Sequence, residues 1–260
     1  MAANCDGLVQ AGFIRKVYAI LSMQLMMTVC GAAFFMLHTS TREFVLHTPS
    51  MFYAAMFLPL GLIFALMCYK DQHPTNMYLL SAFTLCETYT IGVICAMYYE
   101  SGNGMIVLQA LMLTAAVFIS LTVYTLTTKK DFSFLGAGLF AGLVILIVWS
   151  LLNSFFNFGA GGHMVFSLFG ALLFAGGPVL PFYPPVCTPL PVSLCRTLFL
   201  GRNAPNPPYH QGYILYDTSQ IMHNLGPDDY IVAAINLYLD IINLFLYLLE
   251  ILRMLQGGDN

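Results

Sequence analysis

Long apolar stretches, each long enough to cross a lipid bilayer, dominate this sequence. A helix needs about 20 apolar residues to span a hydrocarbon core of about 30 Å. Windows of that length occupy residues 17–37, 50–69, 76–98, 104–127, 132–154 and 230–255. A further segment is broken into two halves, 163–176 and 213–224. The connections between the early windows are short and turn-like, which favours antiparallel neighbours in one bundle.

Composition supports a membrane protein and excludes several other classes. Only 8% of the 260 residues are charged, and 59% are hydrophobic. A soluble domain carries about 25% charged residues, so this chain cannot cover a water-facing surface. The net charge of −3 is too small to indicate a nucleic-acid partner. The seven cysteines show no metal-ligand spacing. We therefore predict an all-α fold: one polytopic transmembrane domain over residues 1–260, with six to seven helices, no cofactor and membrane lipids as its surroundings.

Basic residues predict the orientation in the membrane, because cytoplasmic loops are enriched in them. On one side lie Arg15, Lys16, Lys70, Lys129 and Lys130, whereas the opposite loops contain only Arg42. The N-terminus is therefore predicted to be cytosolic. If the last segment crosses, the C-terminus lies on the far side of the membrane; if that segment is re-entrant, the C-terminus returns to the cytosol.

Two aspartates interrupt apolar helical sequence, Asp217 in the second half of the broken segment and Asp240 in the last one. A carboxylate at membrane depth costs roughly 2.5–3.5 kcal/mol on insertion scales. Such a residue usually faces the bundle interior or a wet cavity and marks an ion, proton or substrate path. We take these two acids as the first candidates for a functional site.

The helical period groups other polar residues with these acids. On the last segment, steps of four and three place one polar face along Asn236, Asp240, Asn243, Tyr247 and Glu250. On the preceding segment, Asp217, Gln220 and Asn224 also share a face. Gly226 can end that helix and Pro227 can begin the next. The tight turn predicts antiparallel neighbours, so Asp217 and Asp240 are expected to approach each other.

Other acids complete the candidate set. Asp228 and Asp229 fall in the first turn of the last helix, where the helix dipole favours anions. We predict that they tune the pathway, as do Asn236 and Asn243, although a plain role at the helix start remains an alternative for the two acids. Glu87, in the third window, is predicted to join Asp217 and Asp240 in one ion or proton site.

The predicted chemistry follows from the repulsion between close carboxylates. Two of them about 4 Å apart repel by roughly 4 kcal/mol at an effective dielectric constant of 20. Such a pair is expected to share a proton or to bind a cation. Ca²⁺ takes oxygen ligands, and Asp217, Asp240 and Glu87 offer only oxygens, so we predict transient Ca²⁺ binding at the two aspartates. The alternative is a set of buried acids that are hydrogen-bonded for packing.

Several stretches resemble the Bax-inhibitor/lifeguard family of membrane proteins. They are FIRKVYAILS at 13–22, GLIFAL at 61–66, LTVYTL at 121–126, KKDFS at 129–133, GAGLF at 136–140, GALLF at 170–174, YDT at 216–218 and LYLDIINLFL at 237–246. The resemblance covers nearly the whole chain outside one segment. It implies a six- or seven-helix bundle in Golgi or endoplasmic reticulum membranes and a pH-sensitive Ca²⁺ leak that lowers store content and inhibits apoptosis.

The resemblance also implies roles and partners. It assigns control of the leak to the acidic pair Asp217 and Asp240, with tuning by the acids near Asp228 and Asp229. The permeant ion would be Ca²⁺, and the protein partners would be apoptosis regulators or intracellular Ca²⁺ channels. Some members carry an arginine in the second span that pairs with the acid, but residues 50–69 contain none.

A proline-rich stretch at 177–212 departs from the family pattern. It holds prolines at 178, 181, 184, 185, 189, 191, 205, 207 and 208, which forbid a continuous helix. Segment 163–176 alone would extend only about 21 Å, whereas joined to 213–224 it would contain about 26 residues and extend about 39 Å, enough to span. We interpret 177–212 as a gene-model artefact such as a retained intron; the alternative is a loop that bulges out of the membrane.

Two other functional classes remain open from sequence alone. An intramembrane aspartyl protease also places two aspartates on adjacent helices, but it needs Gly-x-Gly-Asp at the second acid, and LYLD at 237–240 lacks it. A membrane scaffold or receptor that binds apoptosis regulators without conduction is the second alternative. We favour the leak channel and predict that the chain is not an enzyme.

Overall fold

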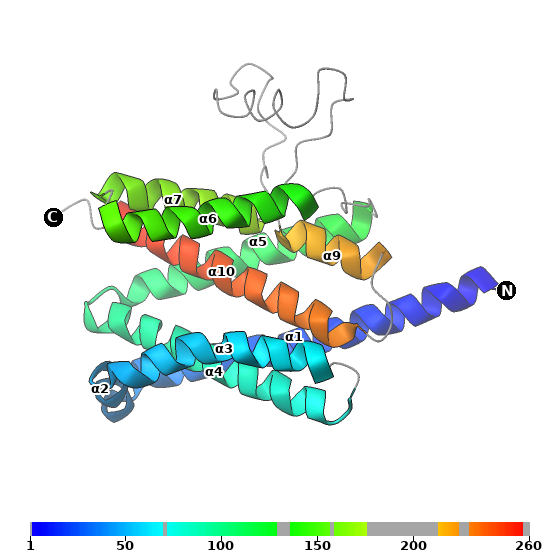
Figure 1. Ribbon diagram of the computed structural model, residues 1–260, viewed down its shortest axis with the longest axis horizontal. Coiled ribbons are helices and arrows are strands. Elements are labelled where there is room, and N and C mark those ends of the chain that lie inside the picture. Colours follow the sequence, from blue (N-terminus) through cyan, green and yellow to red (C-terminus); the bar gives the residue numbers. More distant parts are fainter. Residues whose placement is uncertain are drawn as a thin grey trace, which may run out of the picture.

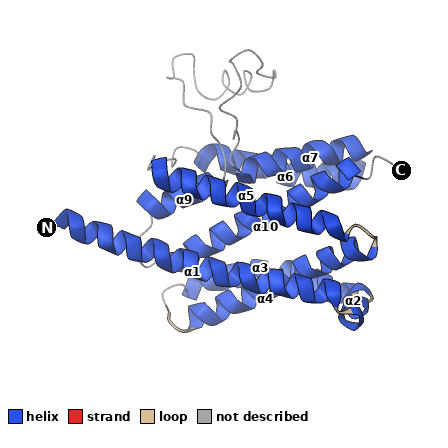
Figure 2. Cartoon of the chain, turned by 180° about the vertical axis from the view of Figure 1, so that it is seen from behind, coloured by secondary structure: helices blue, strands red, loops and turns tan. Residues whose placement is uncertain are grey.

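The computed structural model describes residues 2–69, 72–128, 136–156, 159–175, 213–223 and 229–256. Within these ranges the regular structure is entirely helical, and no strand occurs. The predicted all-α class is confirmed. Figures 1 and 2 show long helices lying roughly side by side in one bundle.

The first half of the bundle contains α1 (Ala2–Leu37), α2 (Thr39–Leu46), α3 (Pro49–Tyr69), α4 (Thr75–Glu100) and α5 (Gly104–Thr128). The four long helices match the predicted windows. The short helix α2 was not predicted. His38 caps its N-terminus, because the ring nitrogen of His38 accepts a hydrogen bond from the backbone N–H of Thr41 at 3.3 Å.

The second half contains α6 (Gly136–Phe156), α7 (Gly159–Ala175), α9 (Tyr213–His223) and α10 (Tyr230–Gln256). Both halves of the broken segment are helical, as α7 and α9. The predicted artefact or loop at 177–212 lies outside the described residues, so both interpretations stay open.

Five of the described helices are long and apolar enough to cross a membrane, and the chain is a multi-pass membrane protein. They cover Gln10–Leu37, Ser50–Tyr69, Thr75–Glu100, Gly104–Thr127 and Tyr230–Gln256. Many large hydrophobic side chains are exposed on them, including Phe57 and Phe64 on α3 and Met112 on α5. In lipid such exposure is favourable, so these faces are the expected bilayer contacts.

Helix α10 is the centre of the bundle. It packs against α1, α5, α7 and α9, and its buried side chains belong to both hydrophobic clusters. Leu237, Tyr238 and Phe245 pack with α1 and α4, whereas Leu244 packs in the second cluster with α6, α7 and α9. Any polar group on the buried face of α10 is therefore held by most of the fold.

Helix α10 also runs the full length of the bundle. At its C-terminal end the carboxylate of Glu250 accepts a hydrogen bond from Tyr98 at 3.1 Å, and Gln256 bonds Gln109 at 2.7 Å. These partners flank the turn between α4 and α5, at the end opposite the start of α1 (Figure 1). Of the two topologies left open by the sequence, a full crossing fits this arrangement.

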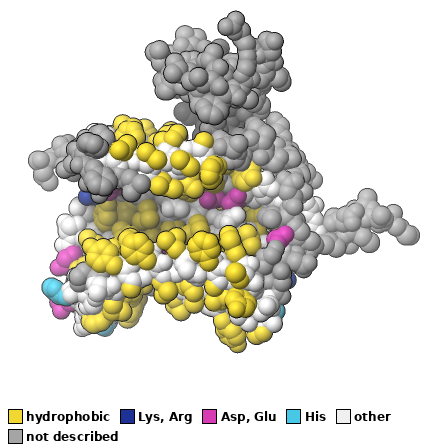
Figure 3. All heavy atoms as spheres, viewed as in Figure 1, with side chains coloured by type: hydrophobic (Ala, Val, Ile, Leu, Met, Phe, Trp, Pro, Cys, Tyr) yellow, Lys and Arg dark blue, Asp and Glu magenta, His cyan; other side chains and the backbone are white. Residues whose placement is uncertain are grey.

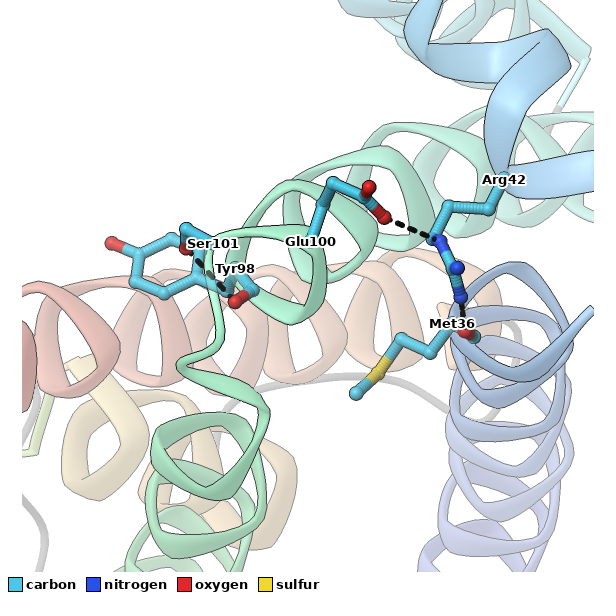
Figure 4. A network of polar contacts seen from close by, with 5 residues as sticks. All are labelled: Met36, Arg42, Tyr98, Glu100 and Ser101. Carbon is cyan, nitrogen blue, oxygen red and sulfur yellow. Dashed lines mark hydrogen bonds and ion pairs between the residues drawn. The ribbon is translucent and has the colours of Figure 1, made fainter. Parts of the chain in front are cut away.

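An arginine ties together the ends of three helices beside that turn (Figure 4). Arg42 of α2 pairs with Glu100 of α4 at 2.8 Å and donates to the backbone carbonyl of Met36 in α1 at 2.7 Å. Its guanidinium also lies 5.0 Å from the centre of the Tyr99 ring. The carbonyl of Met36 is one of the last four of α1, which lack partners within the helix, so Arg42 closes that end of α1.

Candidate functional site

The two intramembrane aspartates meet inside the bundle. Asp217 on α9 is 8% exposed and Asp240 on α10 is 4% exposed. Their carboxyl groups lie close enough to interact with each other. Two ionised carboxyl groups offer each other only acceptors, so a hydrogen bond between them needs a proton on one of the two. We call Asp217 and Asp240 the carboxyl pair.

No basic side chain neutralises the carboxyl pair within the described part of the chain. The ion pairs of Arg42 and Arg253 involve Glu100 and Glu250, near one end of the bundle. One oxygen of Asp240, Oδ2, is buried and has no hydrogen-bond partner among the described residues. An unpaired buried carboxyl oxygen is costly, so this position favours a proton or a cation as an additional partner.

Hydroxyl groups from three helices gather around the turn of α9 that carries Asp217. The Tyr18 hydroxyl of α1 faces Thr122 of α5 and Thr218 of α9, and Thr218 follows Asp217 directly in sequence. All three oxygens are buried, and none completes a well-formed hydrogen bond among the described residues. Three loosely satisfied hydroxyls in the interior form a polar cluster with room for additional hydrogen-bond partners. This cluster was not predicted, because nothing in the sequence links these distant positions.

An aromatic stack lies near the carboxyl pair. The Tyr213 ring of α9 stacks on Phe174 of α7 with centroids 5.1 Å apart, and Phe174 stacks on Tyr247 of α10 at 5.8 Å. The Tyr213 hydroxyl donates to the backbone carbonyl of Leu139 in α6 at 2.7 Å. Tyr213 also interacts electrostatically with both aspartates. The stack thus fixes α9 against three other helices at the acidic site.

Glu87 lies in a different polar cluster. The hydroxyl of Thr28 on α1 lies 3.3 Å from Thr88 of α4 and 2.8 Å from Tyr238 of α10. Because Thr28 donates to the backbone carbonyl of Gln24, Tyr238 donates to Thr28. Glu87 is half-buried and interacts electrostatically with Tyr238. We call Thr28, Thr88 and Tyr238 the hydroxyl ladder.

The three predicted acids therefore do not form one site. No group of three or more His, Cys, Asp or Glu side chains among the described residues could hold a metal ion. Asp217 and Asp240 are together, and Glu87 is separate. A stable cage for Ca²⁺, with six to eight oxygen ligands, is not provided by these acids, and only transient binding at the carboxyl pair is compatible with the donor set.

The remaining predicted residues lie at varied depths. Asn243 of α10 is half-buried, but Asn236 is exposed although it shares a helical face with Asp240. Asp229 is half-buried in the turn before α10, where its carbonyl accepts from the backbone N–H of Ala233 at 3.0 Å. Asp228 lies outside the described residues. Along α10 the polar stripe is therefore most deeply buried at Asp240.

The surface on one side of the bundle is hollowed. Figure 3 shows two bands of hydrophobic side chains with a recess between them and acidic side chains at the recess. The bands are the faces expected to contact lipid. Acidic groups between them are unusual for a membrane-spanning protein and agree with a polar path through the bundle.

Comparisons with known proteins identify the relatives of this chain. The model of a family described as inhibitor of apoptosis-promoting Bax1 matches residues 10–179 and 210–257. A vaccinia virus (strain Lister) protein named Golgi anti-apoptotic protein is 40% identical over 95% of this chain and 86% of its own length. Protein lifeguard 4 of Mus musculus is 39% identical, over 94% and 86% of the two chains. Protein LIFEGUARD 1 of Arabidopsis thaliana is 36% identical, over 92% and 88%.

Proposed function

This chain belongs to the family of inhibitors of apoptosis-promoting Bax1, and we propose that it is a pH-sensitive Ca²⁺ leak channel of intracellular membranes. By lowering the Ca²⁺ content of its store, it would inhibit apoptosis. The ion and proton site of the proposal is the carboxyl pair, Asp217 and Asp240. Ca²⁺ is the permeant ion here and not a resident cofactor.

The observation that carries the proposal is the proximity of two buried, interacting carboxyl groups without a basic partner in the described structure. If both were ionised about 4 Å apart, they would repel by roughly 4 kcal/mol at an effective dielectric constant of 20. A shared proton removes that repulsion, and so does a divalent cation. The pair can therefore alternate between a protonated state and a cation-bound state, which is the chemistry that a pH-sensitive cation path requires.

The surroundings of the pair support an ion path over a purely structural role. Oδ2 of Asp240 lacks a partner, and the hydroxyls of Tyr18, Thr122 and Thr218 are loosely satisfied. A polar network that serves packing alone is normally fully satisfied. Spare oxygens offer temporary ligands to a passing cation. Asn236, Asn243, Asp228, Asp229 and Glu87 are proposed as tuning positions along α10 and α4.

The names of the relatives support the cellular part of the proposal. The vaccinia virus relative is named as a Golgi protein and as anti-apoptotic. We therefore place this chain in the Golgi or endoplasmic reticulum membrane, and we propose apoptosis regulators or intracellular Ca²⁺ channels as its protein partners. We also propose that it is not an enzyme.

The central experiment measures Ca²⁺ efflux from liposomes that contain the purified protein. We compare the unmutated chain with Asp217→Asn and Asp240→Asn, which keep side-chain size and remove the acid. Both variants are expected to release Ca²⁺ more slowly, because the pair loses the charge that attracts a cation. Glu43→Gln is the matched control, since Glu43 is exposed on α2 and its loss should leave efflux unchanged.

The same proteoliposomes separate the competing functions. Efflux at the unmutated rate from both asparagine variants would exclude the carboxyl pair as the path. No efflux from the unmutated chain would favour the scaffold or receptor alternative. Cleavage of a membrane peptide that is lost with either mutation would instead favour an intramembrane aspartyl protease, for which two contacting aspartates are also the required geometry.

A further inference from the structure

A second feature of the bundle is a cavity of about 160 Å³ between α1, α4, α5 and α10. Its lining comes from the C-terminal halves of α1 and α4, the N-terminal half of α5 and the central part of α10, and Figures 1 and 2 show how these helices lie in the bundle. The cavity is distinct from the carboxyl pair, because neither aspartate lines it. Most of its wall consists of aliphatic side chains, such as Leu111 of α5 and Ile241 and Phe245 of α10.

The cavity offers no free hydroxyl donor that would hold water. The hydroxyls of its two threonines donate to backbone carbonyls of their own helices. Thr28 donates to Gln24 at 2.9 Å, and Thr114 donates to Ala110 at 2.7 Å. A water molecule needs two to four polar partners. An apolar cavity of about 150 Å³ stays dry and takes apolar ligands. The chemistry of the wall therefore selects a hydrocarbon.

The cavity is accessible from the side that faces the bilayer. Val29 of α1 and Leu108 of α5 belong to its lining, and their side chains are 41% and 53% exposed. Both helices are membrane spans, so the medium at these exposed residues is lipid. An occupant that enters past Val29 and Leu108 comes from the hydrocarbon layer and not from water.

We propose that this cavity binds the hydrocarbon chain of a membrane lipid, with the chain entering between α1 and α5. The inner wall includes Ile241 and Ile242, which directly follow Asp240 on α10. Thr28 in the wall is also bonded to Tyr238 of the hydroxyl ladder. A bound chain thus packs against the turn of α10 that carries Asp240 and holds that turn against α1.

The test is photolabelling of the full-length protein in phosphatidylcholine liposomes that contain a phosphatidylcholine with a diazirine on one acyl chain. Peptides are then mapped by mass spectrometry. We expect adducts on the lining, at residues such as Leu111 and Ile242, in addition to adducts on the exposed face of α3. Labelling of α3 serves as the internal measure of contact with bulk lipid.

Two variants, each with a phenylalanine in place of an alanine, distinguish labelling inside the cavity from labelling at the lipid-facing surface. Ala33→Phe places a ring in the lining and should abolish the adducts at Ile242 while leaving those on α3 unchanged. Ala115→Phe adds the same ring at an exposed position of α5 outside the lining and should leave both unchanged. If Ala33→Phe fails to fold, Leu111→Trp fills the same space from α5.

The outcomes decide the proposal without any measurement of ion flux. Adducts at Ile242 that disappear only when the cavity is filled support a lipid-chain site. Labelling confined to α3 and other exposed faces would overturn it. Adducts on the lining that persist in both cavity-filling variants would also overturn it, because the probe would then be reaching these residues from outside the cavity.

Discussion

Gly170 is the position where a single methyl group should most clearly disturb the packing around the carboxyl pair. A Cβ added at Gly170 would lie 2.4, 2.5 and 2.6 Å from three ring atoms of Tyr247. Carbon atoms in contact normally lie about 3.5–4.0 Å apart. In the variant Gly170→Ala the ring must therefore shift by about 1 Å or more, or α7 must move away from α10.

The cost can be worked from the contacts of that ring. Tyr247 stacks on Phe174 at 5.8 Å and meets Phe166 edge-on at 5.7 Å, and such aromatic pairs contribute about 0.5–1.5 kcal/mol each. Overpacking typically lowers the free energy of unfolding by about 1–3 kcal/mol. The higher helix propensity of alanine relative to glycine offsets up to about 1 kcal/mol of that loss. We expect a net destabilisation of about 1–2 kcal/mol, which corresponds to a decrease in Tm of about 2–8 °C for a chain of this size.

Thermal unfolding of the purified protein in detergent measures this effect. Gly61→Ala in α3 is the matched control, because an added Cβ there meets no atom within 4 Å; its Tm should stay the same or rise slightly. In the Tyr247→Ala background the ring is absent, so Gly170→Ala should cost nothing further. Equal Tm values for the two glycine variants, or a cost that persists without the ring, would refute the packing argument.

Three further predictions address other contacts. Tyr213→Phe removes the hydrogen bond to the carbonyl of Leu139 and should lower stability by about 0.6 kcal/mol, a typical value for a bond between membrane helices; an unchanged Tm would exclude a contribution from this bond. Arg42→Ala should lower the Tm more than Glu100→Ala, because Glu100 is 59% exposed and exposed ion pairs contribute about 0–1 kcal/mol; the reverse order would contradict this. Ca²⁺ efflux should change between pH 5 and 8, and Asp240→Asn should flatten the profile; a flat profile in the unmutated chain would remove the gating role.

The positions of the long helices could be predicted because the length of an apolar stretch is a local property of the sequence. Each predicted window became a helix wherever the chain is described, and the Gly226–Pro227 turn signal correctly indicated that α9 and α10 are neighbours. Helix α2 was missed, because its eight residues (Thr39–Leu46) carry no membrane-spanning signal. It is held by tertiary contacts, among them those of Arg42 and the buried side chain of Val45, which sequence periodicity does not reveal.

The arrangement of the candidate site could be predicted only for residues on helices that are consecutive in the sequence. The contact of Asp217 with Asp240 follows from two adjacent helices with polar faces. Glu87 was expected to join them but lies near Tyr238 instead, because the position of α4 around α10 depends on packing and not on periodicity. For the same reason Asn236 is exposed although Asp240, one turn later, is buried.

The proline-rich stretch at 177–212 stays a sequence-based prediction. The matched ranges of the family model leave out residues 180–209, which fall inside it. Sequencing of transcripts across the codons for Gly176 and Tyr213 would distinguish a retained intron from a true loop. A shorter in-frame product would favour the artefact, whereas the long form alone would favour the loop.

The most direct test of the central claim is a double-mutant cycle on Ca²⁺ efflux from liposomes, with Asp217→Asn, Asp240→Asn and the combined variant at one pH. Residues that act as one unit are non-additive. We predict that the combined variant is no slower than the slower single variant, because either substitution already breaks the carboxyl pair. Strictly multiplicative reductions would show that the two acids act independently, and they would contradict a shared ion and proton site.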